Sequence, residues 1–392
     1  MEQIPFDTDD GNTMFICLEC IGDPMLKGFK SLPEFEVTCT ACNCLTRQAV
    51  TPARIARFIR KHLPTHFSVD DGLYDGCEMS LAEVVSRAIR CDNLLACKAI
   101  AHKMVSPRAH EDDFYWQGQV YCVKRNPFDD AEHERWWIVG DWHDIAYELS
   151  HERRFFSDKA RKFFESLLHE ALSAEKPCSP GTPAVITTLL SGTELYRARI
   201  AANPTEVQHF KSNPLAELGA PPMDRAKNNR MSAAGFSWMY VSQDTTTCVR
   251  EVLPNQGDMV VVGEFVSTTP LRVFDLNALS LRLKHAPLSL FSPDYEQRSN
   301  HRQLLRYLHD EIAQPIERPE TDYVMTQAFA EYIRCYAPHQ FDGISFRSVQ
   351  HPGGINYALF AKDNAERVRS AYSRPAFDLV ISSDSVTLQI AE

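Results

Sequence analysis

The chain has 392 residues, a length that predicts two or three domains at ~100–200 residues per domain. Hydrophobic residues make up 44% of the sequence and charged residues 24%, which excludes collagen-like, coiled-coil and largely disordered proteins. The 41 basic and 52 acidic residues leave a net charge of -11, so we expect no nonspecific binding to nucleic acid.

The first residues and the hydropathy of the chain predict its compartment. The opening MEQIPFDTDD is acidic, whereas a signal peptide begins with basic residues. No apolar run in the sequence approaches the ~20 residues that span a bilayer. We therefore expect a cytoplasmic protein that does not enter a membrane.

Four of the 12 cysteines stand in two Cys-x-x-Cys pairs, Cys17 with Cys20 and Cys39 with Cys42. Residues 21–38 separate the pairs, a spacing typical of four thiolates on one tetrahedral zinc ion. Cys44 is an alternative to Cys42, but a one-residue gap makes a poorer knuckle. The alternative interpretation of these cysteines is a set of buried free thiols that bind no metal. The spacing predicts a structural zinc ribbon over residues 1–50, with two knuckles joined by a hairpin.

Helical spacing begins at Thr51 and continues to Ala174. Behind a Thr51-Pro52 start, apolar residues recur at helical intervals at Ile55, Phe58, Ile59 and Leu63. Further helical stretches are expected over 80–104 and 130–174. In the last stretch we expect one apolar stripe formed by Phe155, Phe156, Phe163, Phe164, Leu167 and Leu168. The pattern predicts a helical domain over 51–174.

A linker is expected over 175–184, because SAEKPCSPGTP combines prolines, a glycine and polar residues without periodicity. After the linker the sequence mixes both patterns, with strands expected from residues 259, 271, 355 and 377 and helices over 302–316 and 322–336. Their irregular alternation favours an α+β fold over a regularly wound parallel sheet. The last predicted domain, mixed α/β, covers 185–392.

Four blocks of this last domain resemble one known family. They read LYRAR from Leu195, PLAELGAPPMDRAKNNRMSAAGFSWMYVS from Pro214, TTTCVREVLP from Thr245 and FDGISFRSVQHPGGINYALF from Phe341. In this order they resemble the RES domain, an NAD-consuming fold related to ADP-ribosyltransferase toxins. The resemblance extends from Val185 to Glu392.

The resemblance implies six site residues, which in this sequence are Arg197, Arg230, Gly235, Tyr240, Glu251 and Ser348. Gly235 corresponds to a turn glycine of the family. Asn229 stands where the family usually has a glycine before the second arginine. Because asparagine tolerates a positive φ better than other residues with a side chain, we expect the turn to be kept.

Cleavage of the bond between nicotinamide and ribose explains why such residues are needed. Arg197 and Arg230 are suited to bind the pyrophosphate, since a guanidinium pairs with phosphate oxygens bidentately. Tyr240 is suited to hold the nicotinamide against its ring. Glu251 is suited to bind the ribose hydroxyls and to stabilise the developing oxocarbenium ion.

Two further residues near the end of the chain complete the predicted site. Ser348 precedes Gly353 and Gly354, where a hydroxyl and backbone amides are suited to cradle a phosphate or to position an attacking oxyanion. Asn356 follows them, and we expect its amide to face the ligand.

The predicted function is NAD degradation by a glycohydrolase or phosphorylase that acts as an intracellular toxin or defence effector. HERRFF at 151–156 resembles a segment that accompanies RES domains in longer proteins with a HEPN-like helical half. The expected cofactor is structural Zn²⁺, the substrate is NAD, and an antitoxin or immunity protein is the implied partner. Homo-oligomerisation stays open, as do two alternatives: an ADP-ribosyltransferase that modifies a macromolecule, and a zinc-ribbon binding module on an inactive scaffold.

Overall fold

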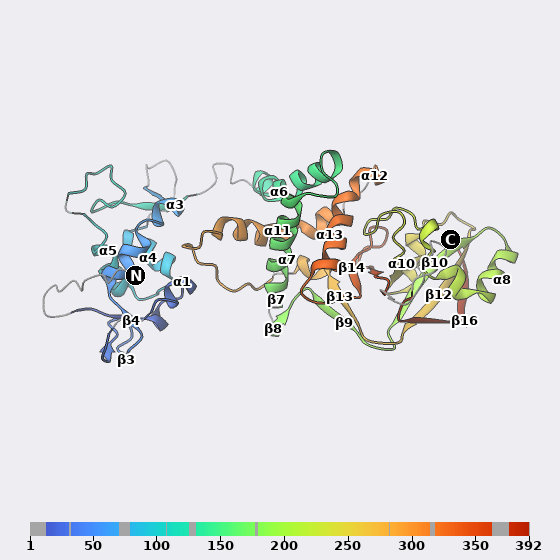
Figure 1. Ribbon diagram of the computed structural model, residues 1–392, viewed down its shortest axis with the longest axis horizontal. Coiled ribbons are helices and arrows are strands. Elements are labelled where there is room, and N and C mark those ends of the chain that lie inside the picture. Colours follow the sequence, from blue (N-terminus) through green and yellow to red (C-terminus); the bar gives the residue numbers. More distant parts are fainter. Residues whose placement is uncertain are drawn as a thin grey trace. The chain divides into compact units, whose positions relative to one another are not determined.

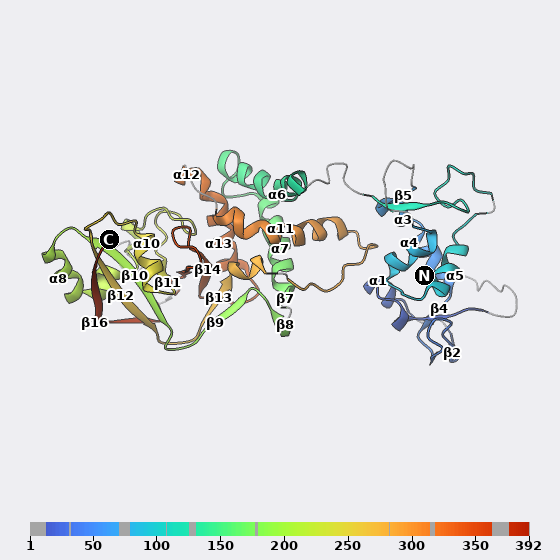
Figure 2. The same ribbon diagram turned by 180° about the vertical axis from the view of Figure 1, so that it is seen from behind.

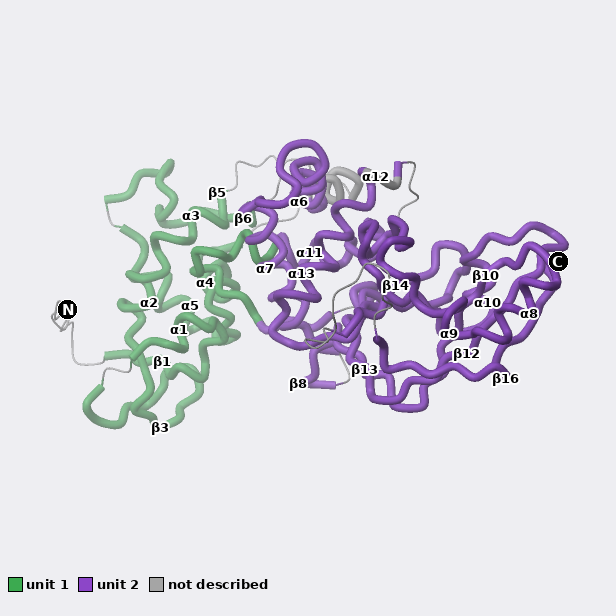
Figure 3. Tube along the Cα trace, turned by 45° about the vertical axis from the view of Figure 1, so that its right-hand side comes forward, with its two compact units in different colours: residues 1–131, 287–299 green, residues 132–286, 300–392 purple. Residues whose placement is uncertain are grey.

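The computed structural model describes residues 13–30, 33–69, 79–106, 108–124, 131–176, 179–281, 283–313, 318–362 and 376–391. The chain forms two compact units (Figure 3). The N-terminal unit contains residues 1–131 and 287–299, and the C-terminal unit contains 132–286 and 300–392. No helix in the described ranges is long and apolar enough to cross a membrane.

Short helices and two-stranded ribbons make up the N-terminal unit. The ribbons pair β1 (Ile16–Cys17) with β4 (Ala49–Val50), β2 (Val37–Thr38) with β3 (Leu45–Thr46), and β5 (Phe67–Val69) with β6 (Tyr121–Val123). The helices are the 3-10 turn η1 (Leu18–Cys20), α1 (Pro24–Lys27), α2 (Pro52–Ile59), α3 (Leu63–His66), α4 (Leu81–Ile89) and α5 (Leu94–His102).

Capping explains where these helices begin and end. Thr51 caps α2 by accepting a hydrogen bond from the Arg54 amide, and Pro52 occupies the first turn as predicted. Ser80 and Glu83 form a capping box at the start of α4. The helical stretch expected over 80–104 is two helices, because Arg90 adopts a left-handed conformation at φ 54° that ends α4.

A segment from much later in the sequence completes the N-terminal core. Phe291 is buried in it, and its ring lies 5.5 Å from that of Phe58. Ser289 Oγ donates a hydrogen bond of 3.0 Å to the buried carboxylate of Asp23. The N-terminal unit is therefore not formed by N-terminal residues alone.

The C-terminal unit is built on one eight-stranded sheet with the order β16-β12-β10-β11-β15-β14-β13-β9 (Figures 1 and 2). Its strands pair antiparallel except β13 with β14, which are parallel. The mixed α+β class is confirmed. The bounds are β9 (Ile186–Leu189), β10 (Glu194–Ala201), β11 (Met239–Ser242), β12 (Met259–Ser267), β13 (Leu271–Asp275), β14 (Gly343–Arg347), β15 (Ile355–Leu359) and β16 (Leu379–Ile390).

Helices cover both faces of this sheet. The long helices α7 and α13 lie beside the β13–β14 part of the sheet, and α8 lies by β16 at the other end (Figure 1). The bounds are α6 (Ala131–His151), α7 (Asp158–Ser173), α8 (Pro204–Ser212), α9 (Pro214–Leu218), η2 (Met223–Arg225), α10 (Thr245–Glu251), η3 (Leu276–Ser280), α11 (Tyr295–Ala313), α12 (Pro319–Asp322) and α13 (Val324–Tyr336).

The division between the units differs from the expected boundary at 175–184. That segment contains β7 (Glu175–Lys176) and β8 (Ser179–Pro183), which pair with each other, and Glu175 bridges to Lys284. Side chains of α6 and α7 are buried in one cluster with α11, α13 and the sheet. Burial of their apolar faces therefore joins both helices to the C-terminal unit, and the chain divides before α6 instead of after α7.

The stripe expected along α7 is shorter than predicted. Phe163 and Phe164 are buried with Leu167 and Leu168, whereas Phe155 and Phe156 are 84% and 93% exposed. The two exposed rings precede Ser157, whose side chain caps α7 by accepting from the Ala160 amide. They stand outside the helix, so its periodicity does not orient them.

Phe164→Ala tests the assignment of α7 to the C-terminal core. The Phe164 ring packs 5.6 Å from that of Phe329 and 5.7 Å from that of Tyr332. Its removal should destabilise the protein by about 3–5 kcal/mol because a cavity remains. Phe156→Ala, the matched control, should change stability by less than about 0.5 kcal/mol. Equal effects in urea denaturation would contradict this packing.

Candidate active site

Glu251 lies at the centre of a hydrogen-bonded group on the C-terminal unit. Glu251 is the last residue of α10. Asp244 caps the start of this helix, because its carboxylate accepts a 2.8 Å hydrogen bond from the Thr247 amide. Glu251 Oε1 accepts bonds from Ser348 Oγ at 2.5 Å and from Asn356 Nδ2 at 2.7 Å. Its Oε2 accepts none within the described ranges, so one carboxylate oxygen is fixed and the other is left for a ligand.

Asn356 is held at both ends of its amide. Strands β11 and β15 pair Ser242 directly with Asn356, which places both side chains on one face of the sheet. Ser242 Oγ donates to Asn356 Oδ1 at 2.6 Å, while Asn356 Nδ2 donates to Glu251. The expected ligand-facing role of Asn356 is therefore not what the geometry shows, because its amide serves to orient Glu251.

The Ser348 hydroxyl is part of a tight loop between β14 and β15. It accepts a 2.9 Å bond from the His351 amide while it donates to Glu251. The Ser348 amide donates to the carbonyl of Gly354 at 2.9 Å, and Gly353 has a φ of 85° that favours glycine. The loop geometry fixes the hydroxyl on the Glu251 carboxylate.

A second contact joins this loop to α10. The buried Thr247 Oγ1 lies 2.7 Å from Asp244 Oδ2 and 2.9 Å from His351 Nδ1. A β-carbon on Gly354 would lie only 2.5 Å from Thr247 Oγ1 and 2.7 Å from its Cγ2. Glycine at 354 is thus required for the loop to lie against the helix.

Tyr240 is fixed by a short turn that precedes β11. Its hydroxyl lies 2.9 Å from Ser232 Oγ, and burial raises the pKa of Tyr240 although hydrogen bonds from Ser232 and Met231 oppose the shift. Gly235 has a φ of 89°, as a turn glycine requires. Asn229 is not among the described residues with positive φ, so the turn does not need a glycine there.

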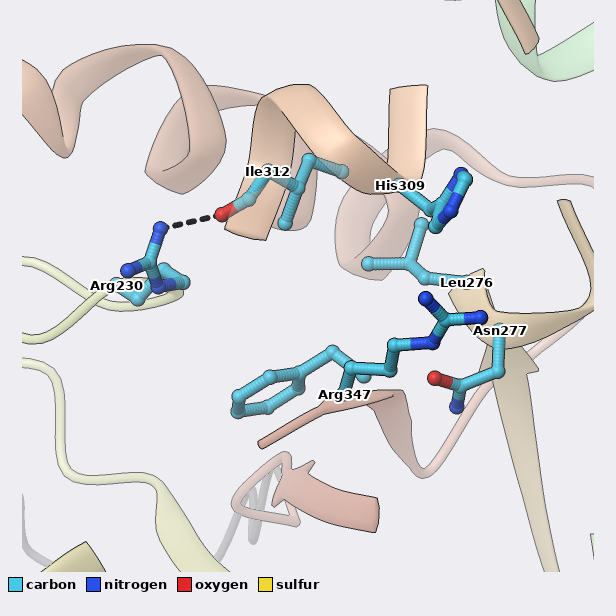
Figure 4. A pocket seen from close by; sticks show the side chains of 7 residues that line it. Arg230, Leu276, Asn277, His309, Ile312 and Arg347 are labelled. Atoms are coloured by element: carbon cyan, nitrogen blue, oxygen red, sulfur yellow. Dashed lines mark hydrogen bonds between the residues drawn. The ribbon is translucent and has the colours of Figure 1, made fainter. Parts of the chain in front are cut away.

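Arg230 is a half-buried cation near this group. Its Nη1 donates to the Ile312 carbonyl (Figure 4), and its guanidinium lies 5.7 Å from the centre of the Tyr323 ring. Burial lowers the pKa of Arg230, and the charges of Tyr323 and Glu251 act in the opposite direction. Arg230 is therefore within electrostatic reach of Glu251.

Arg197 belongs to the other face of the sheet. Tyr196 pairs with Ser242 and shares its face, so the neighbouring Arg197 points the other way. Its Nη1 contacts Met239 Sδ at 3.3 Å. Burial lowers the pKa of Arg197 to about 9, and the nearby Tyr240 raises it. The structure thus joins Glu251, Ser348 and Asn356 directly, brings Arg230 near them, and leaves Arg197 outside their hydrogen-bonded group.

Several supporting residues were not predicted from the sequence. Ser242, Thr247 and His351 hold the predicted residues in position, as described above. Ser242 follows Tyr240 by two residues, so strand alternation could have placed it on the same face. Nothing in the sequence indicated that Thr247 and His351 meet.

The comparison with protein families bears on these same residues. A family model described as the RES domain matches residues 194–382. This part of the chain is therefore similar to the RES domain. No curated protein and no solved structure matches the chain. The RES match fits an enzyme family that acts on NAD and a toxin-like function.

The four paired cysteines lie outside the RES domain and meet in the N-terminal unit. The sulfur atoms of Cys17, Cys20, Cys39 and Cys42 all lie within 4.8 Å of one another. The Cys17–Cys42 and Cys20–Cys39 sulfurs are 3.6 and 4.0 Å apart, close to the about 3.8 Å expected around a tetrahedral ion with Zn–S bonds of ~2.3 Å. The donor set and its spacing fit zinc.

The connection between the two pairs differs from the expected hairpin. Residues 21–38 contain α1, while the hairpin β2–β3 carries the second pair. At its turn Asn43 adopts a φ of 58°, and the Ala41 amide donates to Cys39 Sγ at 3.3 Å. An amide donor to the sulfur stabilises a thiolate, which is the form that binds metal.

Gly354→Ala tests the contact between the Ser348 loop and α10. The added methyl group would overlap Thr247, so the RES domain should lose about 1–3 kcal/mol of stability. Gly140→Ala is the matched control, since a β-carbon there meets nothing within 4 Å and should stabilise helix α6 by about 0.5–1 kcal/mol. Opposite shifts in melting temperature are expected. An unchanged melting temperature for Gly354→Ala would contradict the close packing.

Proposed function

We propose that the RES domain degrades NAD by cleaving the bond between nicotinamide and ribose. The observation that carries this proposal is the Glu251 carboxylate, which two donors hold by one oxygen and which leaves the other oxygen without a partner in the described ranges. A carboxylate fixed in this way can stabilise positive charge without reorganising during the reaction. The match to the RES domain supports NAD as the substrate.

The chemistry needs a fixed negative charge beside the ribose. As the bond between C1′ and the nicotinamide nitrogen breaks, its electron pair neutralises the pyridinium and the ribose becomes an oxocarbenium ion. Glu251 stabilises this cation, while Ser348 and Asn356 act as positioning residues. An oxygen of water or phosphate then bonds to C1′ and loses a proton, which completes hydrolysis or phosphorolysis.

An arginine and a tyrosine bind the parts of NAD that do not react. Arg230 is the stronger choice for the pyrophosphate, because its charge lies within electrostatic reach of Glu251. Arg197 is the other arginine that the family resemblance suggests for the pyrophosphate, but it lies on the opposite face of the sheet and contacts Met239, so we assign this role to Arg230 alone. Tyr240, which has an electrostatic effect on Arg197, holds the nicotinamide ring.

NAD degradation fits a toxin or defence effector in the cytoplasm. No two of the described cysteines form a disulfide with each other, as is usual where thiols are kept reduced. An enzyme that depletes NAD harms its own cell unless it is restrained, so an antitoxin or immunity protein is the proposed partner.

Glu251→Gln tests the catalytic carboxylate. The amide oxygen of glutamine can still accept the bonds from Ser348 and Asn356, so the variant removes the charge and keeps the local structure. Turnover of NAD should fall on the order of a hundredfold, while NAD affinity should change little. Nicotinamide release and NAD titration measure the two quantities.

Glu264→Gln provides the control for loss of one carboxylate elsewhere in the C-terminal unit. Glu264 lies on β12 opposite Tyr196 and forms no hydrogen bond to Glu251. This variant should turn over NAD at the normal rate. Normal turnover by Glu251→Gln as well would remove Glu251 from the mechanism.

We further propose that Cys17, Cys20, Cys39 and Cys42 hold one structural zinc ion. With four thiolates the coordination shell is complete, so no position remains for a catalytic water. The ion would stabilise the N-terminal unit, because metal binding supplies folding free energy in small sites of this kind.

Cys42→Ser and Cys44→Ser form a matched pair that tests the ligand set. Both residues are exposed and their sulfurs are 3.1 Å apart, but only Cys42 belongs to the cluster of four. Metal analysis should give about one zinc per chain for the native protein and Cys44→Ser, and much less for Cys42→Ser. Full zinc content in Cys42→Ser, or none in the native protein, would contradict the assignment.

A further inference from the structure

The connection between α6 and α7 carries the two most exposed large apolar side chains in the described ranges (Figure 1). They are Phe155 and Phe156, at 84% and 93% exposure. All residues of 151–156, which read HERRFF, are exposed, so no other described part of the chain covers the two rings. Neither the core nor the candidate active site uses this motif.

Cations flank the two rings on both sides. Arg153 and Arg154 precede them, while Lys159 and Lys162 follow in the first turns of α7, three residues apart and therefore on one face of the helix. All four side chains are exposed and form no hydrogen bond or ion pair within the described ranges. We call the two rings and these four cations the aromatic-basic tip.

The charge of this segment is opposite to that of the whole chain. Residues 151–162 contain five basic and two acidic side chains, whereas the chain carries a net charge of -11. Of the five basic residues, only Arg161 is paired, with Asp158 and Glu165 at 3.6 Å. A negatively charged partner is therefore attracted to the tip and repelled by the chain as a whole.

The exposure of the rings restricts the shape of the partner. The walls of a pocket or groove cover part of every side chain that lines it, so a ring that is 93% exposed lines neither. A small molecule in a cavity and a nucleic-acid strand in a groove therefore do not fit the tip.

The size of the tip distinguishes between the larger partners. A stable protein interface buries about 800 Å² on each partner, whereas two phenylalanine rings offer about 300–500 Å². A membrane requires no such area, because apolar side chains enter the headgroup region while nearby cations are attracted to anionic lipids. Two protruding rings with four unpaired cations match this mode of binding.

We propose that the aromatic-basic tip binds the surface of anionic membranes. Phe155 and Phe156 insert between the lipid headgroups, and the four cations contact the negative charges of the lipids. This replaces the expectation that the chain does not enter a membrane, which came from the lack of a long apolar run. Insertion of two side chains needs no such run. The proposal does not depend on NAD degradation.

Cosedimentation of the full chain with lipid vesicles tests the tip. The native protein should bind vesicles of equal parts phosphatidylserine and phosphatidylcholine, bind phosphatidylcholine alone far more weakly, and lose affinity as salt is added. Replacing both rings, Phe155→Ala with Phe156→Ala, should weaken binding at least about tenfold. Arg153→Gln with Arg154→Gln should have an effect of about the same size. Unchanged melting temperatures would show that these exposed substitutions leave the fold intact.

Phe35→Ala is the matched control for loss of an exposed ring. Phe35 is 68% exposed in the N-terminal unit, but it stands between the exposed carboxylates of Glu34 and Glu36. Since these charges repel anionic lipids, Phe35→Ala should bind the vesicles as the native protein does.

Phe155→Leu with Phe156→Leu separates insertion into lipid from stacking on nucleic-acid bases. Leucine is apolar but cannot stack, so vesicle binding should stay within about threefold of the native value. The proposal would be overturned if the native protein bound no anionic vesicles, if it bound neutral vesicles equally well, or if the leucine variant lost as much affinity as the alanine variant. Binding of single-stranded DNA or of a second copy through the tip, without binding to vesicles, would also overturn it.

Discussion

The hydrogen bonds to Glu251 are the contacts on which the candidate active site depends. They join the end of α10 to residues 97 and 105 positions further along the chain, Ser348 and Asn356. Such a carboxylate can be held only if the sheet first pairs β11, β15 and β14 in the correct register. A slip by one residue would turn Asn356 away from Glu251, because side chains alternate between the faces of a strand.

The same constraint explains the tight loop after β14. Ser348 reaches Glu251 because Gly354 allows the loop to lie against Thr247, and His351 contacts the same threonine. Helix α10 and the loop after β14 are thus joined by two contacts, Thr247 with His351 and Glu251 with Ser348. The second of these contains the carboxylate proposed to act in catalysis.

The sequence predicted the parts of the fold that depend on local pattern. Strands at 259, 271 and 355 and the clustered cysteine pairs have strong local signals, and the structure contains them. The unit boundary was not predictable in this way, because burial of α7 against Phe329 is a tertiary contact. The separation of Arg197 from Glu251 follows from strand register, which pairs Tyr196 with Ser242 and cannot be read from motif order.

The most direct measurement of the central claim is the identity of the products formed when the purified full chain is incubated with NAD. The account predicts that free nicotinamide appears by NMR, and that mass spectrometry finds ADP-ribose, or its phosphorylated counterpart when inorganic phosphate is present. ADP-ribose attached to an added macromolecule would support the transferase instead. Unchanged NAD, with or without phosphate, would contradict the account.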